Sequence, residues 1–220
     1  MGLYQGLNPP MGWLLAAGRA LQQRSARPLI GTVAALAFGH YLAMLSVLVP
    51  VALLLAWSTR HPELPFASLY LQPGLLLSFV GVVLAGFGVY KLMRPRHPIL
   101  LARVHPNRRV RWSFLMAHLH CGSPVMMLAP FLALAAHYAT PMSGASASAF
   151  LLPLAVLVPA VMVLTLALVA GGVALVVWRF LGLGALTRVW LNFDLGWAVV
   201  FLLMATMALT MGQGHMRMAL

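Results

Sequence analysis

The 220-residue chain is 62% hydrophobic and only 7% charged, with 14 Lys and Arg against two Asp and Glu. A soluble domain carries about a quarter charged residues, so this composition excludes a protein whose surface mostly faces water. The net charge of +12 lies beside apolar segments, where anionic lipid headgroups are the natural partner, and nucleic acid is therefore not expected as a ligand.

Five apolar segments are long enough to cross a bilayer of about 30 Å as helices. A first segment, residues 2–22, is interrupted by Asn8, Pro9 and Pro10, and is either a broken span or a helix on the membrane surface. A broken span is favoured, because no Lys or Arg precedes Arg19 to hold the segment at the surface. We therefore expect an all-α, polytopic membrane bundle of six helices, or five if the first segment does not cross. The five long segments cover roughly residues 29–57, 74–93, 112–137, 149–178 and 189–211.

The cationic residues predict the orientation of the chain in the membrane. Of the 14, 12 fall in the first, third and fifth gaps between the six segments, which keeps these gaps on the cytoplasmic side. The excess of Arg over Lys and the abundant Ala, Gly and Leu are typical of a GC-rich bacterial genome. We expect a multi-pass protein of the bacterial inner membrane with a periplasmic C-terminus, whose basic loop, residues 91–111, contacts anionic headgroups.

The six segments divide into two three-helix halves, residues 1–94 and 112–220, joined by the basic loop 95–111 within one transmembrane domain. Because three is odd, the halves would have opposite orientations. Asn8-Pro9-Pro10-Met11 in the first segment resembles Ser123-Pro124-Val125-Met126 in the fourth. We expect a 3+3 inverted repeat with two broken helices, an architecture that frees backbone groups for a transported substrate. An ordinary proline kink in each helix is the alternative.

Small residues recur along the third span. They are Gly74, Ser78, Gly81, Ala85, Gly86 and Gly88. Small side chains let helix backbones approach closely within a membrane, so these positions predict helix packing and not a site.

Polar groups at membrane depth are costly unless they face the bundle interior, so each is a candidate for a functional site. His40 lies near the middle of the second span, and His120 lies two residues after His118 in the fourth. Side chains two apart point in nearly opposite directions on a helix, and the unwinding that Pro124 permits favours His120. Hydrogen bonding across helix interfaces is the alternative role for each histidine. The predicted substrate site comprises Asn8, Pro9, His40, His120, Ser123 and Pro124, with His40, His120 and Cys121 as ligands for a metal substrate.

Asp194 is the only carboxylate within a predicted span and lies about 9 Å past Arg188 along the helix. Two roles fit it. It either couples proton or cation movement to transport, or it forms an ion pair with an arginine of the cytoplasmic loops.

The chain resembles an uncharacterised family of bacterial six-span inner-membrane proteins. The resemblance covers most of the chain and lies in Gly6-Leu7-Asn8-Pro9-Pro10-Met11-Gly12-Trp13-Leu14, Gly39-His40 and Trp112-Ser113-Phe114-Leu115-Met116-Ala117 leading to His120. At a greater distance, the layout resembles the lysine-exporter superfamily and its nickel/cobalt exporter relatives, which share an inverted repeat and helix-breaking prolines. The chain lacks their His- and Asp-rich first-helix signature, so this second resemblance implies an architecture and not a particular metal.

Together these features favour a secondary transporter, an exporter of a metal cation or a small polar solute, without a resident cofactor. An enzyme is not expected, because no nucleophile–base pair or carboxylate pair is present. An accessory or assembly subunit of a larger membrane complex is the alternative, since few carboxylates and glycine-rich spans suit a protein that packs against neighbours. A b-type haem subunit with His40 and His120 as axial ligands is a third interpretation. A homo-oligomer is compatible with each.

Overall fold

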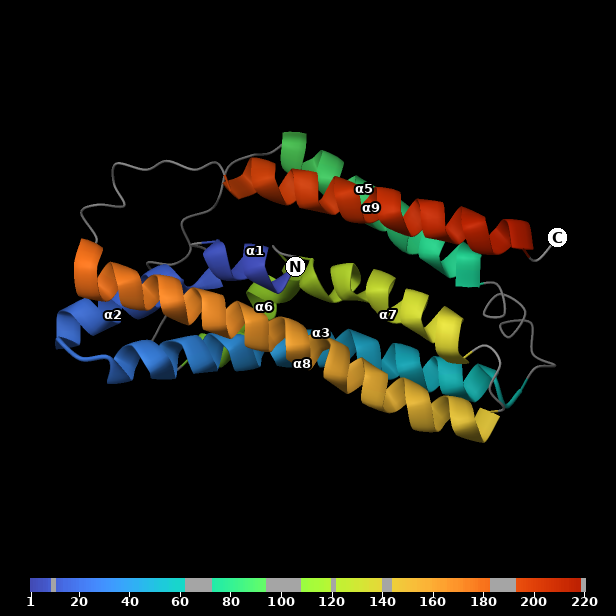
Figure 1. Cartoon of the computed structure of the whole chain (residues 1–220), viewed down its shortest axis with the longest axis horizontal. Helices are drawn as coiled ribbons and strands as arrows, with labels where there is room; N and C mark the ends of the chain where they lie inside the picture. The colour runs from blue at the N-terminus through green and yellow to red at the C-terminus, as the bar shows by residue number, and fades with distance from the viewer. Residues whose placement is uncertain are drawn as a thin grey trace. The chain divides into compact units, whose positions relative to one another are not determined.

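The computed structural model of the protein describes residues 1–8, 11–61, 73–93, 108–119, 122–139, 144–182 and 193–218. Most of these residues are helical and none is in a strand, which confirms the all-α class. The helices are α1 (Gly2–Leu7), α2 (Trp13–Gln23), α3 (Arg27–Ser58), α5 (Pro73–Met93), α6 (Arg109–Leu119), α7 (Ser123–Ala139), α8 (Gly144–Val176), the π-helix η4 (Val177–Leu181) and α9 (Phe193–Met218) (Figure 1).

Four of the described helices are long and apolar enough to cross a membrane: α3, α5, α8 continued by η4, and α9. The pair α6 and α7 adds a fifth candidate if both helices belong to one broken span. The break comes directly before Ser123 and Pro124, where unwinding was expected. Gly122, the last residue before α7, has a φ of 55°, and a Cβ there would lie 3.1 Å from the Phe201 ring of α9. These helices confirm a polytopic membrane protein.

Residues 2–22 form two short helices instead of one continuous one. α1 has six residues and α2 has 11, which correspond to about 9 and 17 Å of helix, so neither crosses a bilayer alone. The break between them lies where Asn8, Pro9 and Pro10 interrupt the apolar segment. The six-span, 3+3 arrangement stays a prediction.

The helices group into two compact units, each assembled from stretches far apart in the sequence. Unit 1 comprises Met1–Ala43, His97–His120 and Ala160–Phe193, and unit 2 comprises Met44–Arg96, Cys121–Pro159 and Asp194–Leu220. Two helices, α3 and α8, contribute one part to each unit. α1, α2 and α6 belong to unit 1, whereas α5, α7 and α9 belong to unit 2 apart from the first residue of α9.

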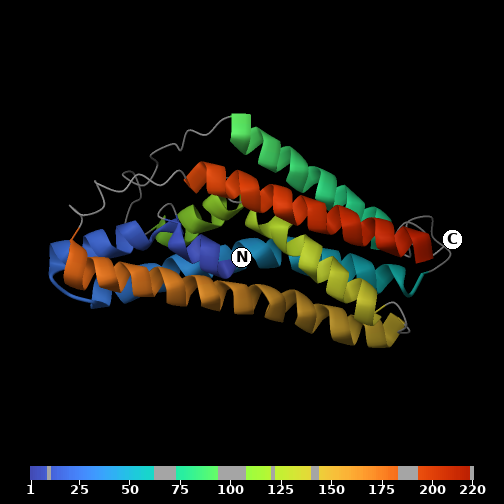
Figure 2. The ribbon, with the colours of Figure 1, turned by 45° about the horizontal axis from the view of Figure 1, so that its top comes forward.

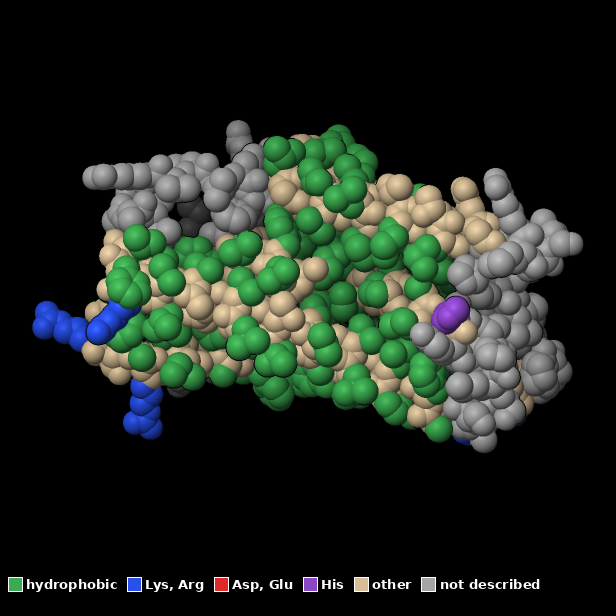
Figure 3. Space-filling view, in the orientation of Figure 1, with side chains coloured by type: hydrophobic (Ala, Val, Ile, Leu, Met, Phe, Trp, Pro, Cys, Tyr) green, Lys and Arg blue, Asp and Glu red, His purple; other side chains and the backbone are tan. Residues whose placement is uncertain are grey.

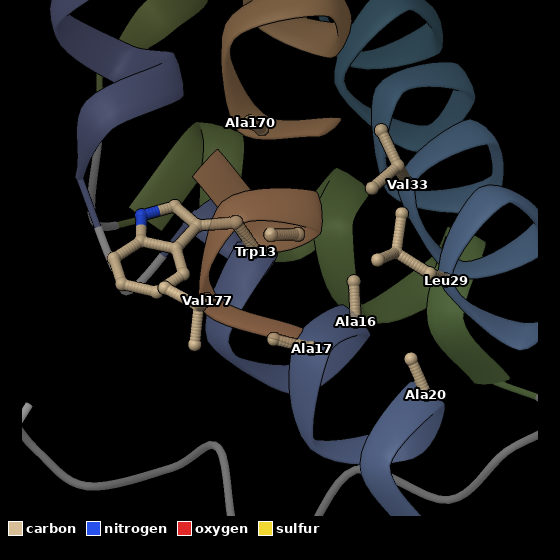
Figure 4. Close-up of a cluster of buried hydrophobic side chains, with 9 residues drawn as sticks. Trp13, Ala16, Ala17, Ala20, Leu29, Val33, Ala170 and Val177 are labelled. Carbon is tan, nitrogen blue, oxygen red and sulfur yellow. The ribbon is translucent and has the colours of Figure 1, made fainter. Parts of the chain in front are cut away.

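The core of unit 1 is built on a face of small side chains along α2. Ala16, Ala17 and Ala20 are completely buried there and pack with Leu29 and Val33 of α3 (Figure 4). Ala170 and Ala174 of α8 and Val177 of η4 complete the cluster from the third side. Alanine lets the backbones approach closely, which favours association where lipid leaves no hydrophobic driving force between helices.

In unit 2, α5 and α9 run side by side along most of their length (Figures 1 and 2). A Cβ added to Gly81 would lie 3.2 Å from the Ala205 carbonyl oxygen, and one added to Gly88 would lie 3.4 Å from that of Ala198. We call this contact the α5–α9 seam. It confirms the expected packing role of Gly81 and Gly88, but the expectation was wrong for Gly86, which is exposed and has no atom within 4 Å of an added Cβ.

Candidate functional site

Two described residues of the break between α1 and α2 have distinct backbone conformations. α1 ends where Asn8 takes an extended conformation, and Gly12 then adopts a φ of 106°, which a residue with a side chain would rarely accept. The interruption leaves the Leu7 carbonyl without a helical partner. The indole Nε1 of Trp13 donates a hydrogen bond to this oxygen at 2.9 Å. The Trp13 side chain therefore satisfies the carbonyl group that the break leaves without a helical hydrogen bond.

Close contacts with two other helices fix the position of α1 and of the break. A Cβ added to Gly2 would lie 2.6 Å from the Met162 carbonyl oxygen of α8, and one added to Gly6 would lie 2.9 Å from that of Leu166. On the other side, Gly12 packs against the Leu36 side chain of α3. α1 and the break thus lie against α8 and α3 of unit 1.

Asn8 is the most informative side chain at the break. It is fully buried, and neither its amide oxygen nor its amide nitrogen has a hydrogen-bond partner in the described part of the chain. Leaving one buried donor or acceptor unsatisfied costs about 1–3 kcal/mol, and here both are affected. Asn8 therefore offers a donor and an acceptor, next to each other, for a bound molecule.

A second buried polar group joins α3 to α6. The Ser113 hydroxyl donates its proton to the Leu36 carbonyl oxygen, and Ser113 Oγ lies 3.1 Å from His40 Nδ1. Because a hydroxyl has one proton, and that of Ser113 is donated to Leu36, Oγ accepts a hydrogen bond from Nδ1–H of His40. Gly39 permits this approach, since an added Cβ would collide with the Val110 carbonyl oxygen. The chain of hydrogen bonds meets the α1–α2 break at Leu36.

Two turns before His40 on α3, the fully buried Thr32 accepts a hydrogen bond of 2.8 Å from Arg109 Nη1 of α6. Partial burial and the neighbouring charge of Arg109 lower the pKa of Arg19 in α2. Arginine side chains of α2 and α6 therefore converge on the first turns of α3. Figure 3 shows Lys and Arg gathered over α2 and the beginning of α3, next to a largely hydrophobic surface.

His118, and not His120, is the α6 histidine that the structure describes. Its imidazole lies against Phe114, with ring centroids 4.6 Å apart, and its Nδ1 lies 3.0 Å from the Phe114 carbonyl oxygen. Sequence reasoning ranked His118 lower, because only one of two histidines at this spacing can face the interior. His120 lies outside the described residues, so its predicted role is untested.

The remaining predicted site residues are distributed as follows. Pro9 and Cys121 lie outside the described residues. Ser123 and Pro124 are buried in the first turn of α7 and belong to unit 2, whereas Asn8 and His40 belong to unit 1. Asp194 lies in the first turn of α9, and its side chain is not described.

Sequence reasoning missed Thr32, Arg109 and Ser113. A signal for them is present in the spacing, because Thr32, Leu36 and His40 recur every four residues on α3, and Arg109 and Ser113 do so on α6. Residues four apart share one face of a helix. The four-residue spacing on each helix therefore indicated two interacting faces, but the sequence alone did not show that the face on α3 contacts the face on α6.

The charge of unit 1 constrains what its site can bind. Nine of the 14 cationic residues fall within unit 1, whereas both carboxylates, Glu63 and Asp194, fall within unit 2. Within the ranges that the structure describes, no group of three or more His, Cys, Asp or Glu side chains could hold a metal ion. The described site consists of an amide, an imidazole and hydroxyls in a basic unit.

Neither a protein-family model, nor a curated protein, nor a solved structure matches the chain significantly. The family resemblances drawn from the sequence therefore stay expectations.

Proposed function

We propose that the protein is a membrane transporter of a small polar solute that is neutral or anionic, bound at the break between α1 and α2. The observation that carries the proposal is the Asn8 amide, fully buried and without a hydrogen-bond partner in the described chain. An amide in this state lowers stability, so its presence is explained by a ligand that uses its donor and its acceptor. Broken helices at membrane depth are a common setting for such sites in transporters.

The charge distribution favours a neutral or anionic solute over a metal cation. With nine cationic residues and no carboxylate in unit 1, the electrostatic potential there repels cations and attracts anions. An amide with adjacent donor and acceptor complements a carboxylic acid, an amide or an amino acid backbone. Sequence reasoning assigned His40 to substrate binding or proton relay, and its hydrogen bond with Ser113 places it in the same unit as Asn8.

The proposal includes the finer features that the sequence predicts. The protein lies in the bacterial inner membrane with its basic gaps on the cytoplasmic side, where anionic headgroups surround them. The break between α6 and α7 corresponds to that between α1 and α2, as a 3+3 inverted repeat requires. Export as the direction of transport rests on the sequence resemblance alone.

The binding step is tested by thermal unfolding of the detergent-purified protein with acetamide, glycine or acetate, and separately with nickel or zinc chloride. The variant is Asn8→Leu, and the matched control is Gln23→Leu, which removes an exposed amide from α2. A ligand at 100 times its Kd stabilises the folded state by about 2.7 kcal/mol. We expect at least one of the three solutes to raise the Tm of wild type and Gln23→Leu, but not of Asn8→Leu.

Two results would contradict this assignment. In one, no solute raises the Tm, or the rise persists in Asn8→Leu. In the other, only a metal salt does so, which returns the metal-cation hypothesis to first place. Co-purification of wild type with another membrane protein at fixed stoichiometry would favour the accessory-subunit alternative.

A further inference from the structure

The α5–α9 seam has a regular register. Gly74 faces Gly212, Gly81 faces Ala205 and Gly88 faces Ala198, so each step of seven residues along α5 moves the contact seven residues back along α9. The two helices are therefore antiparallel, and the C-terminal end of α5 lies beside the N-terminal end of α9 (Figure 2). This register predicts which residues face each other one turn beyond Gly88.

Lys91 lies one turn beyond Gly88 and on the same side of α5. Its side chain is only 5% exposed. Lysine is almost never buried to this degree unless it is paired, because removing an ammonium group from water without a counter-charge is costly. The long stem of an exposed lysine would instead carry the charge to the headgroups. The burial of Lys91 therefore requires a negative charge nearby.

The sequence contains two carboxylate side chains that could supply it. Glu63 precedes Pro73, the first residue of α5, and Lys91 lies about 27 Å further along the helix. Asp194, by contrast, comes four residues before Ala198 and so shares the face of α9 that meets Gly88.

The helix dipoles favour the same arrangement. Lys91 is in the last turn of α5, where the partial negative charge of the helix stabilises a cation. Asp194 is the second residue of α9, where the partial positive charge stabilises an anion. Each charge is thus at the helix end that favours its sign, and both ends lie at the same end of the seam.

We propose that Lys91 and Asp194 form an ion pair across the α5–α9 seam, at the end where α5 finishes and α9 begins. The pair gives Asp194 a fixed partner, in place of a loop arginine or a transported cation. It ties the two helices together beyond the last glycine contact. This inference is independent of the solute site in unit 1.

A double-mutant cycle in the full-length protein tests the pair. Lys91→Met and Asp194→Asn each remove one charge with little change in size, and each should lower the Tm by roughly 5–10 °C, because the remaining charge loses its proposed partner. The double variant should lose much less than the sum, and the exchange Lys91→Asp/Asp194→Lys should recover part of the loss. Arg60→Gln combined with Asp194→Asn is the control and should be additive.

Cross-linking tests the same juxtaposition in membranes without relying on stability. In a Cys121→Ser background, a short bifunctional maleimide should join Lys91→Cys to Asp194→Cys, but not Val89→Cys to Asp194→Cys, because Val89 is exposed on another side of α5. Additive Tm losses in the cycle, or equal cross-linking of the two cysteine pairs, would overturn the inference. A loss on Lys91→Met that varies with anionic lipid but not with Asp194 would overturn it in favour of a lipid phosphate.

Discussion

The α3–α6 contact of unit 1 and the α5–α9 seam of unit 2 both pack through glycine residues, but the side chains around those glycines differ in polarity. In both, glycine removes the side chain where one backbone meets another helix. Beside Gly39, the neighbouring positions are polar and bonded, with His40 to Ser113 and Arg109 to Thr32. Beside Gly81 and Gly88, the neighbours are aliphatic.

This difference suggests separate roles for the polar side chains of unit 1 and the aliphatic side chains of the α5–α9 seam. Aliphatic and small residues are sufficient to join two helices in lipid, so the polar groups of unit 1 are not needed for packing alone. They are expensive at membrane depth, and the proposed solute site would account for their retention. Substitutions that change either the size or the polarity of a side chain, but not both, test whether the polar groups of unit 1 differ in role from the residues of the seam.

The largest effect is expected for Gly39→Ala. The added methyl group collides with the Val110 carbonyl oxygen, a backbone atom that cannot move away easily, and lies 2.8 Å from Ser113 Cβ. Because the hydrogen bond to His40 is also disturbed, we expect a loss of about 2–4 kcal/mol in unfolding free energy. Gly31→Ala on the same helix has no atom within 4 Å and should be neutral or slightly stabilising. Thermal or denaturant unfolding in detergent compares the two.

In the α5–α9 seam, Gly212→Ala should cost about 1–3 kcal/mol, because its Cβ would lie 2.6 Å from the Gly74 carbonyl oxygen. Gly214→Ala, two residues on, meets nothing within 4 Å. It should gain up to about 1 kcal/mol from helix propensity. The same unfolding measurement applies. Equal behaviour of the two variants would mean that the seam does not form.

The contrast in polarity is tested by Ser113→Ala against Ser78→Ala. Ser113 bonds to His40 and to Leu36, so its loss should cost about 1–2 kcal/mol. The Ser78 hydroxyl, buried in the seam, has no hydrogen-bond partner in the described chain, so its removal should be neutral. If both variants lose stability equally, the polar contact of unit 1 is no different in kind from the seam.

Asn8→Leu should have the smallest effect on stability, and with the opposite sign. Leucine has a similar size and removes a buried amide without breaking a hydrogen bond, so we expect unchanged stability or a gain of up to about 1 kcal/mol. Unfolding without solute measures it, with Gln5→Leu as the comparison at another buried amide of α1. A clear loss on Asn8→Leu would show that the amide is structural.

Much of the fold is predictable because it follows from long apolar segments. Helices α3, α5, α8 and α9 needed only hydropathy and length, and the break after α1 followed from Asn8 and two prolines. The partners of His40 were not predictable, since hydropathy does not encode which face of α6 meets α3. Arg109 illustrates the limit, because it was counted as a loop cation and instead reaches Thr32. Lys91 was likewise assigned to a basic loop, and only its burial revealed another environment.

The most direct test of the account is solute counterflow in proteoliposomes with radiolabelled acetamide, glycine and acetate. Wild type and Gln23→Leu should accumulate at least one label transiently against its gradient, and the folded Asn8→Leu variant should lose this accumulation. Counterflow that is unchanged in Asn8→Leu, or absent from folded wild type with all three labels, would contradict a solute site at the α1–α2 break.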